Sequence, residues 1–233
     1  MARKRSRKIA ECAYCGEIKE ITRDHVIPVC LFKLPYPKNL ITVPACHECN
    51  HAKSKNDDYL RDLITTDIYG NQSPIAREIF ENKVVRSSQN NRSLMAREFL
   101  SKVRIEPFHT KGGIYLGDFP SAPVDPEKIK TIFATIVRGL FYDHRRQRIP
   151  DNYVFEVLRY HPWDFKDVWE SLGQMHPNGP RVLEGVFGCK YISATEDPPT
   201  TLWLLWFYGT FFISVSAMNP ELIEERTVDK KQK

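Results

Sequence analysis

The chain has 233 residues, of which 42% are hydrophobic and 27% charged, a globular balance that excludes wholesale disorder and a fibrous repeat. This length suits one large domain or two small ones. Residues 1–60 hold 11 Lys and Arg against 7 Asp and Glu, so this quarter carries +4 of the net +5. A local basic excess favours a polyanionic partner, and nucleic acid is the first candidate.

Residues 1–8 form a basic arm with five Lys and Arg side chains. No apolar stretch typical of a secretory signal follows them, so we expect a cytoplasmic protein whose six cysteines are reduced. The arm is either a solvated tail or a contact to nucleic-acid phosphates. Arg3, Lys4 and Arg5 are its candidate phosphate ligands.

Two CxxC motifs follow, Cys12 with Cys15 and Cys46 with Cys49, and 30 residues separate them. This spacing predicts a four-cysteine structural zinc site, with a redox couple as the alternative. Residues 9–56 contain few large apolar side chains, and a structural zinc can supply on the order of 10 kcal/mol of folding free energy. Two further cysteines, Cys30 and Cys189, lack a partner at ligand spacing and are predicted to be buried thiols.

An adjacent acid and histidine, Asp24 and His25, interrupt the apolar run between the two CxxC motifs. Neighbouring side chains on a strand point to opposite faces, so one of the pair can reach a metal while the other faces a water beside it. Alternatively, Asp24 caps a turn and His25 is an ordinary polar residue. Asn39 precedes the second CxxC motif, and Asn50 follows its last cysteine directly.

The order CxxC, Asp-His-Val-Ile-Pro, Asn-Leu, CxxC-Asn-x-x-Lys resembles HNH endonucleases of the ββα-metal fold, over residues 9–58. The resemblance implies a zinc held by both motifs and a catalytic Mg or Mn bound by Asp24 and Asn50. It also implies that His25 is the general base and that Asn39 fixes the loop that orients it.

Asn50 stands where many members of that family carry a His, so the neighbouring His47 and His51 are alternative ligands. The residue types suit the reaction, because a neutral His accepts a proton from water and oxygen ligands suit Mg or Mn. Candidate phosphate contacts in this module are Arg23, Lys53 and Lys55, unless the two lysines lie on a solvated helix face.

Residues 59–106 are predicted to be a helical extension, with helices at about 57–68, 74–85 and 93–103. Residues 107–124 lie in a stretch rich in Pro and Gly and are predicted to be a connecting loop.

Residues 125–220 are predicted to form a second α+β region of unknown role, followed by a charged tail at 221–233. A long helix over 128–146 begins at the N-cap Asp125 and the first-turn Pro126, and it ends in a basic cluster from His144 to Arg148. Shorter helices are predicted at 153–160 and 164–175. Strands at 182–192, 201–208 and 211–217, turning at Gly209, form a small antiparallel sheet.

Residues 198–220 carry no charge and are barely long enough to span a membrane, but their Thr, Ser and aromatic content favours strands. The aromatic residues there are predicted to be core, with part of them at a subunit interface.

The sequence therefore predicts an α+β protein with an N-terminal zinc-bound ββα-metal (HNH) module, a helical middle, and C-terminal helices with a small antiparallel sheet. The expected function is DNA hydrolysis by a metal-dependent endonuclease, as a restriction or phage-defence effector. The alternative is a non-catalytic zinc ribbon that binds nucleic acid. A homodimer is possible, and we expect neither a membrane partner nor a small-molecule cofactor.

Overall fold

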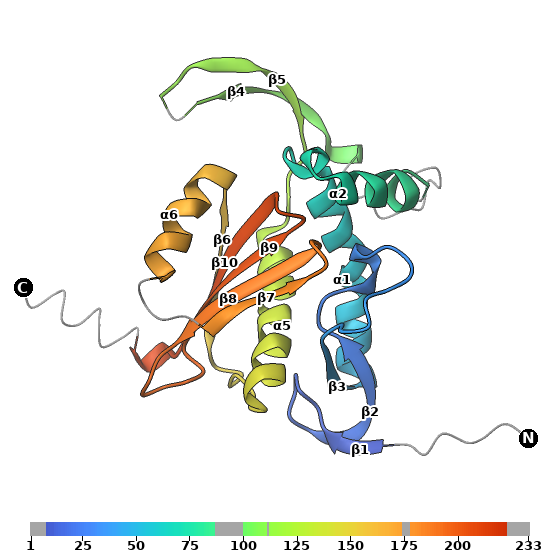
Figure 1. The fold of residues 1–233 in the computed structure, drawn as a ribbon, viewed down its shortest axis with the longest axis vertical. Helices are drawn as coiled ribbons and strands as arrows, with labels where there is room; N and C mark the ends of the chain where they lie inside the picture. The colour runs from blue at the N-terminus through green and yellow to red at the C-terminus, as the bar shows by residue number, and fades with distance from the viewer. Residues whose placement is uncertain (1–7, 87–99, 111, 174–177, 223–233) are drawn as a thin grey trace, which may run out of the picture.

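The computed structural model describes residues 8–86, 100–110, 112–173 and 178–222. Within them, the chain forms a mixed α+β fold with three antiparallel sheets (Figure 1). A three-stranded sheet lies near the N-terminus, a two-stranded hairpin projects from one end, and a five-stranded sheet occupies the C-terminal half.

The N-terminal sheet has the order β1-β2-β3 and precedes the first helix. Its strands are β1 (Lys8–Glu11), β2 (Ile18–His25) and β3 (Thr42–Cys46), and α1 (His47–Thr66) follows at once. Cys46 is the N-cap of α1, because its sulfur accepts from the Cys49 amide. The helix predicted over 57–68 is thus the second half of a longer one, which begins inside the second CxxC motif.

The middle of the chain is helical as predicted up to Val85, with irregular turns, but residues 104–106 of the predicted helical extension lie in a β-strand. A short turn η2 (Gly70–Gln72) leads to α2 (Pro74–Ile79), which Ser73 caps and which continues as the π-helix η3 (Phe80–Val85). The helix predicted over 93–103 lies outside the described residues up to position 99. Its remainder forms the 3-10 turn η4 (Leu100–Lys102).

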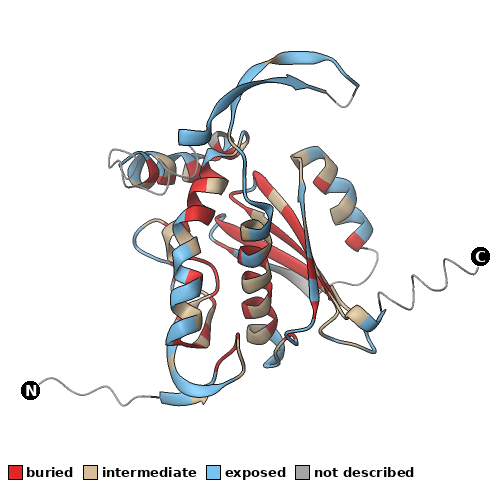
Figure 2. Cartoon of the chain, turned by 180° about the vertical axis from the view of Figure 1, so that it is seen from behind, coloured by how far each residue is buried: buried red, intermediate tan, exposed pale blue. Residues whose placement is uncertain are grey.

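The loop predicted over 107–124 is instead a β-hairpin, β4 (Arg104–His109) paired with β5 (Tyr115–Ser121). Pro107 and Pro120, which argued against strands, are tolerated because both strands of an isolated hairpin are edge strands. The hairpin stands away from the body of the protein, and nearly all of its residues are exposed (Figures 1 and 2).

The long helix of the C-terminal half, α5 (Pro126–Arg145), agrees with its prediction. The Asp125 carboxylate accepts hydrogen bonds from the amides of Glu127 and Lys128, which satisfies two of the free donors of the first turn. One apolar stripe of the helix is buried, including Phe133, Ile136, Val137, Leu140 and Phe141.

The five-stranded sheet has the order β6-β10-β9-β8-β7. Its elements, with the helix α6 that follows β6, are β6 (Val154–Tyr160), α6 (Pro162–Gly173), β7 (Asn178–Leu183), β8 (Phe187–Ser193), β9 (Thr201–Phe207) and β10 (Phe211–Met218). The prediction of a helix at 153–160 is wrong, because this segment is the strand β6 and pairs with β10. The single strand predicted over 182–192 is in fact the end of β7, a turn and most of β8, which pair as a hairpin.

Both faces of β9 are covered from within the chain. Trp203, Leu205 and Phe207 pack in the main core with α5, whereas Leu204 packs with Phe165 of α6. The apolar side chains on both faces of β9, which suggested a subunit interface, are therefore packed against α5 and α6 of the same chain. Among the described residues, no helix combines the length and apolarity that a membrane crossing requires.

The main hydrophobic core is continuous from the N-terminal sheet to the five-stranded sheet. It joins Cys12 and Val26 of the N-terminal segment to Phe133 of α5 and Phe207 of β9. A buried hydrogen bond of 2.7 Å, from the Tyr208 hydroxyl to the Leu31 carbonyl, crosses the same boundary. Segments 9–58 and 125–220 therefore pack against each other through shared apolar contacts.

Candidate functional site

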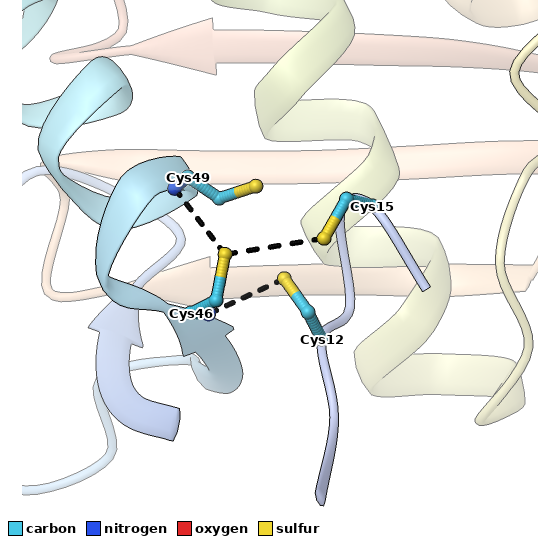
Figure 3. A group of neighbouring side chains, drawn as sticks. All are labelled: Cys12, Cys15, Cys46 and Cys49. Atoms are coloured by element: carbon cyan, nitrogen blue, oxygen red, sulfur yellow. Dashed lines mark hydrogen bonds between the residues drawn. The ribbon is translucent and has the colours of Figure 1, made fainter. Parts of the chain in front are cut away.

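The four cysteines of the two CxxC motifs meet at one point, with their sulfurs directed toward each other (Figure 3). All four Sγ atoms lie within 4.8 Å of one another, and the sulfurs of Cys15 and Cys46 are 3.9 Å apart. A tetrahedral zinc with Zn–S bonds of about 2.3 Å separates its sulfurs by about 3.8 Å. The cluster thus fits a structural metal ion such as zinc.

Backbone amides already point at this cluster. The Cys46 amide donates to the Cys12 sulfur at 3.3 Å, and the Cys49 amide donates to the Cys46 sulfur at 3.5 Å. Burial opposes ionisation of Cys12, but amide hydrogen bonds outweigh it and lower the pKa of this thiol to about 7. Burial raises the pKa of Cys49 above the ordinary thiol value. A bound cation removes the cost of gathering four thiolates here.

Next to the cysteine cluster, Asp24 lies near the end of β2 with only 5% of its surface exposed. The Tyr14 hydroxyl donates to Asp24 Oδ2 at 2.5 Å, and Lys53 Nζ lies 3.4 Å from Oδ1. Tyr14 is one of the two residues between Cys12 and Cys15, so one side chain joins the cluster to this carboxylate. Burial, followed by the charge of Asp24, raises the pKa of Tyr14 and keeps its hydroxyl protonated.

Lys53 occupies a position that sequence analysis did not foresee. Expected as a surface contact to phosphate, it is only 8% exposed and donates to the His25 carbonyl at 2.7 Å. Its ammonium also faces the carboxylates of Asp24 and Asp57, at 3.4 and 3.7 Å. In this structure, Lys53 is an internal counter-ion and not a free cation.

His25 is the last residue of β2 and lies opposite Thr42 of β3. Its side chain is half-buried, on the face of the sheet opposite to Asp24. Burial lowers the pKa of His25, and the positive charges of Lys53 and Arg23 add to this effect against the opposing charge of Asp24. The neutral imidazole is therefore favoured.

Asn50 lies in the first turn of α1, and its amide donates to the Thr22 hydroxyl at 2.8 Å. Thr22 and Asp24 share one face of β2, so Asn50 and Lys53 lie side by side across from them. Asn39 is exposed in the turn that precedes β3. The alternative ligands His47 and His51 are exposed and stack on each other, with ring centroids 6.1 Å apart.

The other candidate phosphate contacts separate into two groups. Arg23 and Lys55 are exposed, as a phosphate ligand must be. Arg3, Lys4 and Arg5 lie outside the described residues.

Oxygen ligands at Asp24 and Asn50 suit Mg or Mn, but the surroundings of Asp24 fit such an ion only in part. One Asp24 oxygen accepts from Tyr14, and the other faces the Lys53 ammonium. A divalent ion on Asp24 therefore requires Lys53 to move away. Asp24 and Asn50 contact different partners in this structure.

The roles of two residues of this site were not predicted from the sequence. Tyr14 occupies a variable position of a CxxC motif, where any residue satisfies the spacing. Arg148, predicted only as part of a basic cluster, donates to the Tyr14 carbonyl at 2.8 Å and pairs with Asp151. The loop after α5 thus fixes the backbone of Tyr14 through Arg148, and the Tyr14 hydroxyl in turn donates to Asp24.

Comparison of the chain with protein-family models, with curated proteins and with solved structures gives no match.

Proposed function

We propose that this protein is a metal-dependent endonuclease of the HNH type that hydrolyses DNA phosphodiester bonds. The observation that carries the proposal is the position of Asp24 and His25. They end a strand that pairs with β3 and runs beside α1, whose first turn contains Asn50 and the last cysteine of a metal-binding cluster. The same residues in the same order carry the sequence resemblance.

In this proposal, His25 accepts the proton of the attacking water. Lys53 holds the His25 carbonyl, so the backbone at the end of β2 is fixed where the imidazole must be placed. A divalent ion, when bound, supplies a Lewis acid for the developing charge on the phosphate. Asp24 and Asn50 would hold it once the Lys53 ammonium is displaced from Asp24.

A second candidate function is supported by the surroundings of Asp24. A carboxylate that accepts from Tyr14 and pairs with Lys53 already has the partners that a structural role requires. The protein would then be a zinc-stabilised module that binds nucleic acid without cleaving it.

Nicking of supercoiled plasmid with Mg or Mn separates the two functions. We expect the wild-type protein to nick, and His25→Ala to keep DNA binding while its cleavage rate falls by roughly 10²–10⁴-fold. His109→Ala, in the exposed β4–β5 hairpin, is the matched control and should nick at the wild-type rate. Salt-dependent DNA binding without nicking by the wild-type protein would instead establish the non-catalytic function.

A further inference from the structure

An open groove of about 470 Å³ lies between the N-terminal sheet and the last turn of α5. Strands β1, β2 and β3 form one wall, and Tyr142 and Arg146 form the other. The walls come from segments more than 95 residues apart in the chain, so the groove exists only in the folded protein.

The groove is basic. Lys8, Arg23 and Arg146 line it, and among the described residues no Asp or Glu does. All three are exposed, with the Arg146 side chain 69% accessible. Its nearest carboxylate, Asp143, is 3.8 Å away and also pairs with Arg181, so it neutralises Arg146 only weakly. The negative end of the α5 dipole, about half a charge, is smaller than the three cations together.

The groove extends to Thr42, the residue that lies opposite the candidate general base His25 on the neighbouring strand. Arg23 pairs with Pro44 and His25 with Thr42, so these two pairs follow one another on the same face of the sheet. Residues two apart on a strand are separated by about 7 Å, and successive phosphates of one DNA strand advance by about 3.4 Å along the helix axis. When one phosphate of a DNA strand binds Arg23, the phosphate about two nucleotides further along the same strand therefore lies near His25.

We infer that this groove binds the sugar-phosphate backbone of nucleic acid, with Arg146 of the C-terminal half as a phosphate ligand. The inference rests on the proposed function for the choice of DNA as ligand. Its contacts are to phosphate, so the binding is independent of base sequence. The hydroxyl of Thr42, which also lines the groove, is a further donor to phosphate oxygens.

The test is fluorescence anisotropy of a labelled duplex DNA without added divalent ion, so that no cleavage occurs. Each phosphate contact contributes about 0.9 to the slope of log affinity against log salt, or about eightfold in affinity at 0.1 M salt. Arg23→Ala and Arg146→Ala should each bind about eightfold more weakly at 0.1 M salt, with a slope lower by about 0.9. The double variant should lose about twice that slope. Arg104→Ala, an equal charge change on the exposed β4–β5 hairpin, is the control and should bind like the wild type.

Wild-type affinity and slope in both groove variants would overturn the inference, as would an equal loss in Arg104→Ala. The proposed function is judged separately, by plasmid nicking. If the wild-type protein nicks plasmid and the groove variants bind DNA like the wild type, the nuclease function is supported and phosphate binding by the groove is rejected. If the groove variants lose DNA affinity but the wild-type protein does not nick, phosphate binding by the groove is supported and the nuclease function is rejected.

Discussion

The side chains of Tyr14, Asp24 and Lys53 form a buried polar network that links the cysteine cluster to the end of β2. A buried carboxylate is tolerated only when its oxygens are hydrogen-bonded and its charge is paired. Tyr14 supplies the short hydrogen bond, and Lys53 supplies the charge. The Lys53 ammonium pairs with both Asp24 and Asp57, so it neutralises Asp24 only in part. The hydrogen bond from Tyr14 is therefore a large part of what stabilises the buried Asp24 carboxylate.

We expect Tyr14→Phe to lower the free energy of unfolding by about 1–3 kcal/mol, because it leaves one oxygen of a buried carboxylate without its donor. Urea denaturation followed by circular dichroism measures this change. The zinc content should remain that of the wild type, since no cysteine is altered.

Tyr36→Phe is the matched control, because Tyr36 is 43% exposed and the same hydroxyl is removed at the surface. It should change the stability by less than about 0.5 kcal/mol. Equal stabilities of Tyr14→Phe and the wild type would show that the hydroxyl does not support Asp24.

At the scale of secondary-structure elements, α5 approaches the N-terminal sheet closely at Gly139. A Cβ atom at this position would lie 2.8 and 2.9 Å from the two methyl carbons of Val26, and 3.1 Å from the Tyr14 hydroxyl. Glycine is therefore needed for packing in the middle of a helix, where it otherwise costs about 1 kcal/mol relative to Ala. The helix can pack against Val26, which directly follows β2, and against the first CxxC motif only because this side chain is absent.

Gly139→Ala tests that close approach. Overpacking costs about 1–3 kcal/mol and the better helix propensity of Ala gains about 1 kcal/mol, so we expect a net destabilisation of about 0–2 kcal/mol and no rise in the melting temperature. Gly112→Ala should leave it nearly unchanged, because the nearest atom to an added Cβ there is 3.8 Å away. A higher melting temperature for Gly139→Ala would mean that α5 has room for an added methyl group beside Val26 and Tyr14.

For the whole molecule, the shared core predicts that the metal cluster and the five-stranded sheet unfold together. The cysteine cluster lies at the N-terminal end of this core, and all four tryptophans lie in the C-terminal half. Trp203 is 2% exposed within the sheet, so tryptophan fluorescence reports on a part of the protein far in sequence from the metal.

Zinc release, followed with a chromogenic chelator, should therefore have the same denaturant midpoint as tryptophan fluorescence, as one cooperative transition requires. Cys46→Ala should abolish the bound zinc and shift the fluorescence midpoint to lower denaturant, because a structural zinc contributes on the order of 10 kcal/mol. Cys189→Ala, which removes a buried thiol outside the cluster, should retain about one zinc per chain. Two well-separated midpoints in the wild-type protein would contradict a shared core.

Local patterns in the sequence were sufficient for the elements that depend on local interactions. The CxxC spacing predicted the four-cysteine cluster, and the periodicity of 128–146 with Asp125 and Pro126 predicted α5 and its cap. The strands β9 and β10 and the turn between them also followed from sequence, since Gly209 adopts a φ of +69° there. In each case the determining residues are neighbours along the chain.

Only the tertiary structure decided the features that depend on distant partners. Residues 154–160 became a strand because β10 pairs with them, and β4 became a strand, despite Pro107, because β5 lies beside it. Lys53 is buried because α5 packs beside it and because its ammonium pairs with the buried carboxylate of Asp24, 29 residues away in the sequence. Spacing and periodicity describe one segment at a time, whereas the burial and charge of a side chain are set by whichever segment packs against it.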